Sequence, residues 1–466
     1  MKLFYVLILM ASMATVFMAP ACAQDAAPAP PLSETQPTEP APAQPAAESP
    51  AVVSPESPAP VADDTAVQEK PTVPIPPAPP AKTPTTEDEL HLALKAKNPN
   101  YMGRMRAMAD EKGIKAVQVN DPGVTDLSPL KGMPLEYLDI SGTGVTDISL
   151  LKGMPLEVFV AQSVPLKDIS VLKGMPLKAV VLNDDKEITD ISALAGAELI
   201  AFQGAGTSIV DITPLKDSKL EEIVLSGSKV KDLSPLKGQP LKSLTISDTN
   251  VEDLSPIQGM ELQAADLKGT PVKDLSPLKG MPLQELYIEE TDVTDLSPLA
   301  GMELRKLYLS GTDVEKLDAL KGMPLTELNA VKTKVKDLSP LSRGALQMVW
   351  LNETPVEDIT PLASNPLASV TLADTKVKDL KPLAVCPTLE RLHIARTPVT
   401  DITALGGLPR LQRLIFTPSK IEKGIDAIRN KQSIRELGTA FGTEEEGDTR
   451  MVPDEFWQAY DEDKLK

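Results

Sequence analysis

Aspartate is the chemistry-bearing residue that this sequence repeats most regularly, at intervals of 21 or 22 residues with one gap of 42. The repeated carboxylates are Asp126, Asp147, Asp168, Asp190, Asp211, Asp232, Asp253, Asp274, Asp295, Asp337, Asp358, Asp379 and Asp401. Stacked carboxylates could bind calcium, which prefers oxygen ligands. However, calcium arrays in repeat proteins use glycine-rich motifs that are absent here, and an aspartate before Ser-Pro more often accepts N–H bonds within its own turn. We therefore expect these aspartates to stabilise turns, and we expect no metal site.

Catalytic side chains are scarce. The chain has two histidines and two cysteines, which leaves neither a two-histidine metal site nor a shared histidine base. No Walker loop, kinase catalytic loop, G-x-S-x-G elbow or H-E-x-x-H motif occurs. We predict that the protein is not an enzyme and needs no cofactor. The formal net charge of −19 also argues against nucleic acid or an anionic membrane surface as a partner.

Binding is the chemistry that the aromatic residues favour. The chain has six tyrosines and two tryptophans, and several fall at strand positions that we expect to face solvent, where amphipathic rings favour binding. The predicted partner-binding residues, with their charged neighbours, are Tyr137, Glu285, Tyr287, Lys306, Tyr308, Glu327, Trp350, Arg391, His393 and Arg413. We predict a protein partner. A glycan is the alternative, because exposed rings also stack on sugars. A purely structural role, with Tyr287 stacking on Tyr308 to cover the sheet, is the third interpretation.

A repeated unit must position these residues. Each unit reads LxxLxLxxTxV followed by DLSPLKGMP, so that alternating apolar residues predict a strand and the second part predicts a tight turn. In the first turn we expect Ser128 to cap, Pro129 to begin the turn and Gly132 to close it. Methionines that recur in this part, and Cys386 in the same position, are interpreted as core filler.

These motifs resemble the leucine-rich repeat family, and the D-[LI]-[ST]-P-L tract is similar to bacterial internalin-like repeats and to the DLSPLKGMPL arrays of planctomycete-type proteins. The resemblance covers about Ile114 to Phe416. It implies an α/β solenoid, a horseshoe of about 15 short coils with a parallel sheet on the concave face and 3-10 turns on the convex face. The sequence departs from the family by placing threonine where asparagine is usual. These threonines, whose hydroxyls can still bond to nearby backbone, are Thr143, Thr207, Thr249, Thr270, Thr291, Thr312, Thr333, Thr354, Thr375 and Thr397.

The two ends of the repeat array need covers for their exposed cores. At the start, Thr86 and Glu89 predict a capping box that opens a helix through Lys97. At the other end, a helix beginning at Pro453 would carry Phe456, Trp457 and Tyr460 on one side. We predict an N-terminal cap over 86–113, a repeat domain over 114–437 and a C-terminal cap over 438–466. A partner-docking role for the last helix is the alternative.

The N-terminal region predicts export. Residues 1–23 start with Lys2, run largely apolar and end in Ala21-Cys22-Ala23, a pattern typical of a cleaved signal peptide. Lipid anchoring through Cys22 is less favoured, because the preceding residues lack the usual leucine. Residues 24–85 hold 18 of the 45 prolines and no aromatic residue, and they predict a disordered Pro/Ala-rich linker. We expect a monomer in the periplasm, at the cell surface or outside the cell, without a transmembrane segment after cleavage.

Overall fold

The computed structural model describes residues 83–440 and 449–465. All described residues belong to one compact unit, Ala78–Lys466. The predicted signal peptide, Cys22 and almost all of the predicted linker lie outside the described residues, as does an acidic stretch before residue 449. Within the described ranges, no helix is both long enough and apolar enough to cross a membrane.

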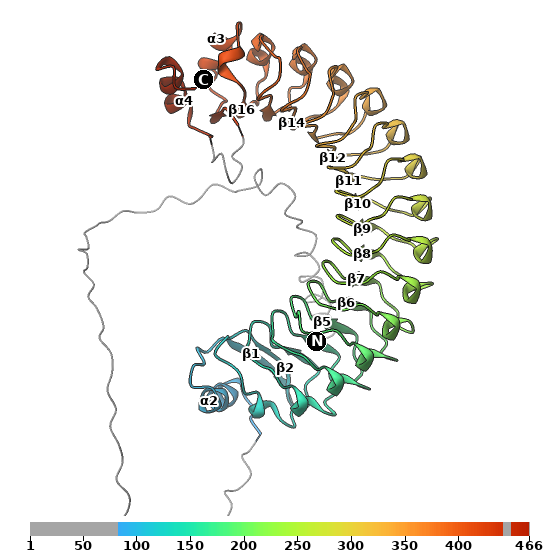
Figure 1. The fold of residues 1–466 in the computed structure, drawn as a ribbon. Helices are drawn as coiled ribbons and strands as arrows, with labels where there is room; N and C mark the ends of the chain where they lie inside the picture. Colours follow the sequence, from blue (N-terminus) through green and yellow to red (C-terminus); the bar gives the residue numbers. More distant parts are fainter. Residues whose placement is uncertain (1–82, 441–448, 466) are drawn as a thin grey trace, which may run out of the picture. The chain divides into compact units, whose positions relative to one another are not determined.

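Each repeat folds into one coil that contains a three-residue strand and a 3-10 turn (Figure 1). The strands of the coils are β3 (Tyr137–Asp139), β4 (Val158–Val160), β5 (Ala179–Val181), β6 (Ala201–Gln203), β7 (Glu222–Val224), β8 (Ser243–Thr245), β9 (Ala264–Asp266), β10 (Glu285–Tyr287), β11 (Lys306–Tyr308), β12 (Glu327–Asn329), β13 (Met348–Trp350), β14 (Ser369–Thr371), β15 (Arg391–His393) and β16 (Arg413–Ile415). The strands line the inner side of the curved stack and the 3-10 turns line its outer side (Figure 1), as predicted.

The 3-10 turns follow the strands in strict alternation. Their bounds are η1 (Ser128–Leu130), η2 (Ser149–Leu151), η3 (Ser170–Leu172), η4 (Ser192–Leu194), η5 (Thr213–Leu215), η6 (Ser234–Leu236), η7 (Ser255–Ile257), η8 (Ser276–Leu278), η9 (Ser297–Leu299), η10 (Asp318–Leu320), η11 (Ser339–Leu341), η12 (Thr360–Ser364), η13 (Lys381–Val385), η14 (Thr403–Gly407) and η15 (Pro418–Lys420). A left-handed glycine follows many of these turns, as at Gly132 with a φ of 78°. Only glycine adopts this conformation without strain, so the predicted role of Gly132 is confirmed.

All strands belong to one sheet. From β2 (Gly113–Val119) to β17 (Glu436–Gly438), each strand pairs in parallel with the next coil's strand. The first strand, β1 (Met105–Asp110), was not predicted and pairs with β2 in the antiparallel direction. The register places Tyr287 opposite Asp266 on one side and Tyr308 on the other. Residues at the same position of successive repeats are therefore neighbours on adjacent strands, as the repeat predicted.

The core is a column of aliphatic side chains that runs through the stack. Leu286 and Leu307, at the centres of their strands, are fully buried, as are most of their equivalents. The recurring methionines are also buried, with Met133 at 2% exposure, and Cys386 in the same row is at 1%. Burial raises the pKa of the Cys386 thiol, which suits the predicted role of this row as core filler.

A short helix covers the first coil. Helix α2 (Glu87–Lys97) starts with the predicted capping box, in which Thr86 accepts from the Glu89 N–H and the Glu89 carboxylate accepts from the Thr86 N–H. At its C-terminal end, the side chain of Asn98 accepts the Thr125 and Asp126 N–H groups and donates to two carbonyls. The cap is therefore joined to the first coil by directed hydrogen bonds as well as by apolar contact.

The last coil is sealed by aromatic residues. Two helices, α3 (Ile425–Arg429) and α4 (Pro453–Asp461), follow the repeats, and α4 packs on β17. Phe456 is fully buried and its ring lies 5.6 Å from that of Phe416 in the last coil. Trp457 is also buried, with the Arg429 guanidinium 5.4 Å from its ring centre. The aromatic side of the C-terminal helix thus faces the core, as predicted.

Candidate functional site

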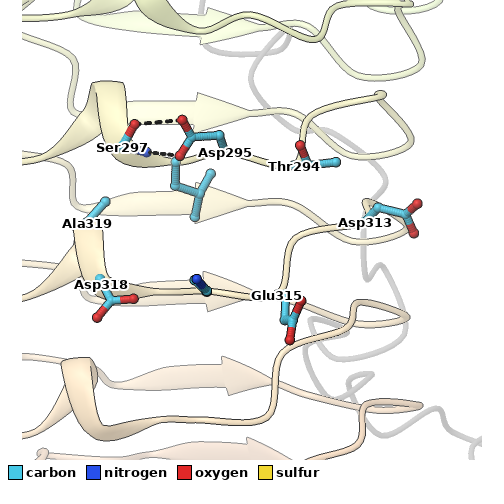
Figure 2. A pocket seen from close by; sticks show the side chains of 9 residues that line it. Thr294, Asp295, Ser297, Asp313, Glu315, Asp318 and Ala319 are labelled. Atoms are coloured by element: carbon cyan, nitrogen blue, oxygen red, sulfur yellow. Dashed lines mark hydrogen bonds between the residues drawn. The ribbon is translucent and has the colours of Figure 1, made fainter.

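The repeated aspartates cap turns and do not form a metal centre. In all thirteen cases the carboxylate accepts the backbone N–H two residues later, at 2.7 to 2.9 Å. Figure 2 shows Asp295, which accepts from both the N–H and the hydroxyl of Ser297, and these bonds lower the pKa of Asp295. Among the described residues, no group of three or more His, Cys, Asp or Glu could hold a metal ion.

The expected capping role of Ser128 was therefore wrong. The side chain of Ser128 accepts no capping bond in the first turn, and Asp126 accepts the Ser128 N–H instead. The reason is geometric, because the 3-10 turn begins at Ser128 itself, so the residue two positions earlier is the one whose side chain reaches the free N–H.

One coil departs from this pattern. Lys316 stands where an aspartate is expected, Asp318 replaces serine and Ala319 replaces proline. The turn η10 still forms, and a hollow of about 350 Å³ opens between this coil and the preceding one, with Leu296 in its wall. Its rim holds Asp295, Asp313, Glu315 and Asp318 (Figure 2).

The predicted aromatic residues do meet on the inner sheet. The rings of Tyr287 and Tyr308 lie 5.1 Å apart at 72°, and those of Tyr308 and Trp350 lie 5.9 Å apart at 61°. We call these three residues the aromatic cluster. Both contacts are edge-to-face, the geometry that aromatic quadrupoles favour. Tyr137 is the first residue of β3, whereas the three cluster residues are each the last residue of their strand. The ring of Tyr137 is not among the rings that contact the cluster.

The predicted exposure of these rings was wrong for most of them. Tyr137, Tyr287 and Trp350 are only 6 to 7% exposed and His393 only 3%, whereas Tyr308 remains half-buried. The low exposure of these rings has a physical reason. Parallel strands lie only ~4.8 Å apart, so large side chains in one row cover one another across the strands. The interpretation as cross-strand stacking therefore describes the contact between Tyr287 and Tyr308.

The predicted charged residues form pairs within the sheet. Glu285 accepts a hydrogen bond from the Tyr287 hydroxyl at 3.0 Å and lies 3.1 Å from the Lys306 ammonium. Glu327 accepts from the Tyr308 hydroxyl at 2.6 Å. All three of these charged side chains are half-buried. The network holds the rings in place and leaves parts of the charged groups open to solvent.

The basic residues lie farther along the sheet. Arg391 and Arg413 are neighbours on β15 and β16, and Arg413 forms an ion pair with Glu436 on β17. Burial, helped by Arg396, lowers the pKa of His393 to about 3, so this residue is neutral at physiological pH. Part of the positive charge at this end of the sheet is therefore neutralised by Glu436 on β17.

Two acidic residues lie beside the aromatic cluster and are not among the partner-binding residues predicted from the sequence. Asp266 is half-buried on β9, and Glu289, two residues after Tyr287, is only 3% exposed. Burial is the main cause that raises the pKa of Glu289 to about 7, and the charge of Asp266 adds to it. The sequence did contain a signal for Glu289, because this acid stands at a repeat position that is serine in nearby coils, at Ser226, Ser247 and Ser310.

Comparison with known proteins addresses the fold. No protein-family model and no curated protein matches the sequence significantly. Among solved structures, the plant peptide hormone receptor RGFR1 in complex with RGF2 is similar, with a TM-score of 0.54 at 16% identity over 67% of this chain and 57% of that chain. The LRR ectodomain of the Arabidopsis receptor kinase HAESA, solved with a peptide hormone, gives a TM-score of 0.52 at 17% identity over 65% and 57%. The chain folds as a leucine-rich repeat solenoid.

An internalin from Listeria monocytogenes is also similar, with a TM-score of 0.44 at 21% identity over 70% of this chain and 87% of that chain. The inner sheet of the chain carries the aromatic cluster and its charged neighbours. Burial and the neighbouring Glu285 raise the pKa of Tyr287 above its ordinary value, and His393 is neutral and buried.

Proposed function

We propose that this protein is an exported, non-catalytic leucine-rich repeat protein that binds a protein partner through its inner sheet. The contact surface consists of Tyr308 and the half-buried charged residues around it, with the buried rings of Tyr287 and Trp350 packed on either side of Tyr308 in the same row of the sheet. Its predicted members are Tyr137, Glu285, Tyr287, Lys306, Tyr308, Glu327, Trp350, Arg391, His393 and Arg413.

The aromatic cluster is the observation that carries this proposal. The core below it is complete without aromatic residues, since Leu286, Leu307 and Val349 fill the central strand positions with no exposed surface. The large rings of Tyr287, Tyr308 and Trp350 are therefore not needed to fill the interior, and they gather in neighbouring coils on the inner sheet. Aromatic residues next to charged groups are typical of the centres of protein interfaces.

Two further observations favour a protein over a glycan. The structurally similar plant receptors were both solved in complex with peptide ligands. In addition, stacking on a sugar needs an open ring face, whereas in this chain Tyr287 and Trp350 are almost fully covered and Tyr308 has an edge contact on either side. Charged groups beside a partly open tyrosine suit a polar peptide better.

Photo-crosslinking in the native cell envelope tests the partner class. We place the photoreactive residue p-benzoylphenylalanine at Met348, which is half-buried on β13 beside Trp350. We expect it to capture a protein identified by mass spectrometry, and we expect the capture to be lost when Tyr308→Ala is added. The same photoreactive residue at Leu92, which is 73% exposed on helix α2, is the control. Equal capture from both positions, or capture unaffected by Tyr308→Ala, would contradict the proposal.

Export is part of the same proposal. We infer that residues 1–23 are removed and that the Pro/Ala-rich segment from Gln24 onward separates the repeat domain from its point of attachment or release. N-terminal sequencing of the mature protein is expected to begin at Gln24. A blocked, lipid-modified terminus at Cys22 would show instead that the protein is anchored.

A further inference from the structure

Two carboxylates lie at the edge of the aromatic cluster. Asp266 is opposite Tyr287 in the sheet, and its carboxylate accepts hydrogen bonds from the Lys268 N–H at 3.1 Å and from the Ser247 hydroxyl. Glu289 lies in the next coil, on the same face as Tyr287 because it is two residues away. Glu289 is only 3% exposed, and its Oε2 atom has no hydrogen-bond partner among the described residues.

This arrangement is not required by the fold. The Glu289 carboxylate accepts its own backbone N–H, but its buried Oε2 atom accepts no hydrogen bond. A buried carboxylate oxygen without a partner destabilises the folded state, because the charged form loses hydration that its remaining bonds do not fully replace. The next coil has Ser310 at the same position and the preceding coil has Lys268, so the repeat does not require an acid there. The charge of Lys268 acts to lower the pKa of Glu289, but burial outweighs it.

We propose that Asp266 and Glu289 form a subsite for a basic side chain, Lys or Arg, of the protein partner. This inference rests on the proposed function and specifies which partner segment meets this part of the surface. A cation would supply the hydrogen-bond donor that the Oε2 atom of Glu289 lacks and would offset part of the negative charge of the two carboxylates. It enters past Asp266, which remains partly exposed to solvent.

The structure also predicts the spacing within the partner. Trp350 lies three coils beyond Tyr287, about 14 Å at ~4.8 Å per strand. Its indole N–H is buried and has no acceptor in the described ranges, so a backbone carbonyl of the partner is its natural acceptor. An extended segment advances ~3.3 Å per residue. A segment that crosses the strands therefore places its basic residue about four residues from the carbonyl that reaches Trp350.

Selection of displayed peptides tests the subsite directly. A library of random twelve-residue peptides is panned on the full chain, and the enriched peptides are measured against Glu289→Gln, Asp266→Asn and Tyr308→Ala. We expect the enriched peptides to contain Lys or Arg. We also expect both acid variants to weaken binding roughly ten- to a hundredfold, the range for a lost hydrogen bond to a charged group. Glu303→Gln removes an exposed acid outside the inner sheet and is expected to leave binding unchanged.

The outcomes separate the two proposals. Peptides that lose binding with Tyr308→Ala but show no basic preference, or that bind Glu289→Gln and Asp266→Asn as tightly as the natural protein, would overturn the cation subsite alone. If no enriched peptide depends on Tyr308, the proposed function itself fails and the subsite with it. Circular dichroism verifies the fold of each variant, and Asp266→Asn carries the test if Glu289→Gln is unfolded.

Discussion

At the scale of single residues, threonine takes over a structural task in this repeat. All ten threonines that replace the usual asparagine are buried, and each hydroxyl donates to the carbonyl three residues earlier at 2.5 to 2.8 Å. A threonine hydroxyl has one proton to donate, whereas an asparagine amide has two. The prediction that these hydroxyls bond to nearby backbone is confirmed, and each bond stays within its own coil.

The buried Glu289 predicts a measurable dependence of stability on pH. Its pKa is about 7 in the folded state against an ordinary value of 4.5, with Asp266, Lys268 and Glu290 as the charged groups around it. A folded state that holds its proton more tightly than the unfolded state loses stability as the pH rises from about 4.5 to 7. Glutamine mimics the protonated acid. Glu289→Gln should therefore raise the free energy of unfolding by on the order of 1–3 kcal/mol at pH 8.

Urea unfolding at pH 8 and pH 4.5 provides the measurement. The gain from Glu289→Gln should shrink toward zero at pH 4.5, where the natural glutamate is already protonated in the folded state. Glu303→Gln, at an exposed position, should show no comparable change between the two pH values. A gain that is the same at both pH values would mean that the effect of Glu289 is not electrostatic.

The positions of the site residues were predictable, but their exposure was not. Alternation along the strand and the 21-residue period place Tyr287, Tyr308 and Trp350 on one face, and the sheet confirms these rows. Exposure depends on side-chain rotamers and on contacts between neighbouring rows. Tyr308 remains partly open while Tyr287 beside it is covered, and no feature of the repeat distinguishes the two positions.

At the scale of elements, the capped 3-10 turn is the unit that the repeat conserves along the chain. The sequence predicted a tight turn from Ser-Pro and Gly, but it assigned the cap to Ser128 and not to Asp126. The difference depends on where the turn begins, and boundaries are the least certain part of any prediction from sequence. The same rule identifies Lys316 as the site where the cap is missing.

Restoring that cap should stabilise the chain. The double change Lys316→Asp and Asp318→Ser recreates the Asp-x-Ser pattern of the neighbouring coils, and one side-chain cap contributes about 0.5–2 kcal/mol. We expect a higher thermal midpoint and slower hydrogen exchange in η10. Lys336→Gln makes the same net charge change, −1, at an exposed position where no cap can form and is expected to give no gain. Equal effects of the two changes would contradict the capping mechanism.

At the scale of the whole molecule, each coil depends mainly on its neighbours. The period, the alternation and the family resemblance were sufficient to predict the solenoid, its sheet and the aromatic cover on the last coil. The antiparallel strand β1 was missed, because the sequence MRAMAD in β1 lacks the apolar alternation that marks the other strands. This segment forms a strand because it pairs with β2, and its local sequence pattern alone did not reveal that.

Loss of the terminal seal should loosen one end of the stack. Phe456→Ala removes a fully buried ring from the contact with Phe416, a change that typically costs about 3–5 kcal/mol. Because stability in a solenoid passes between neighbours, hydrogen exchange should rise in β16 and β17 before it rises in β8. Leu244→Ala, in the middle of the stack, should raise exchange around β8 instead. Uniform loss of protection in both variants would show that the stack unfolds as a single unit.

Strand β1 also decides how one copy of the chain meets another. A parallel ladder that ended at β2 would offer a row of free backbone groups on which a second chain could add its own strands. In this chain the ladder reverses direction at β1, whose pairing is disturbed between Met108 and Ala109. The side chain of Glu87 on helix α2 also accepts the Ala107 N–H. These features make end-to-end strand addition less favourable at this end of the sheet than on a regular parallel edge.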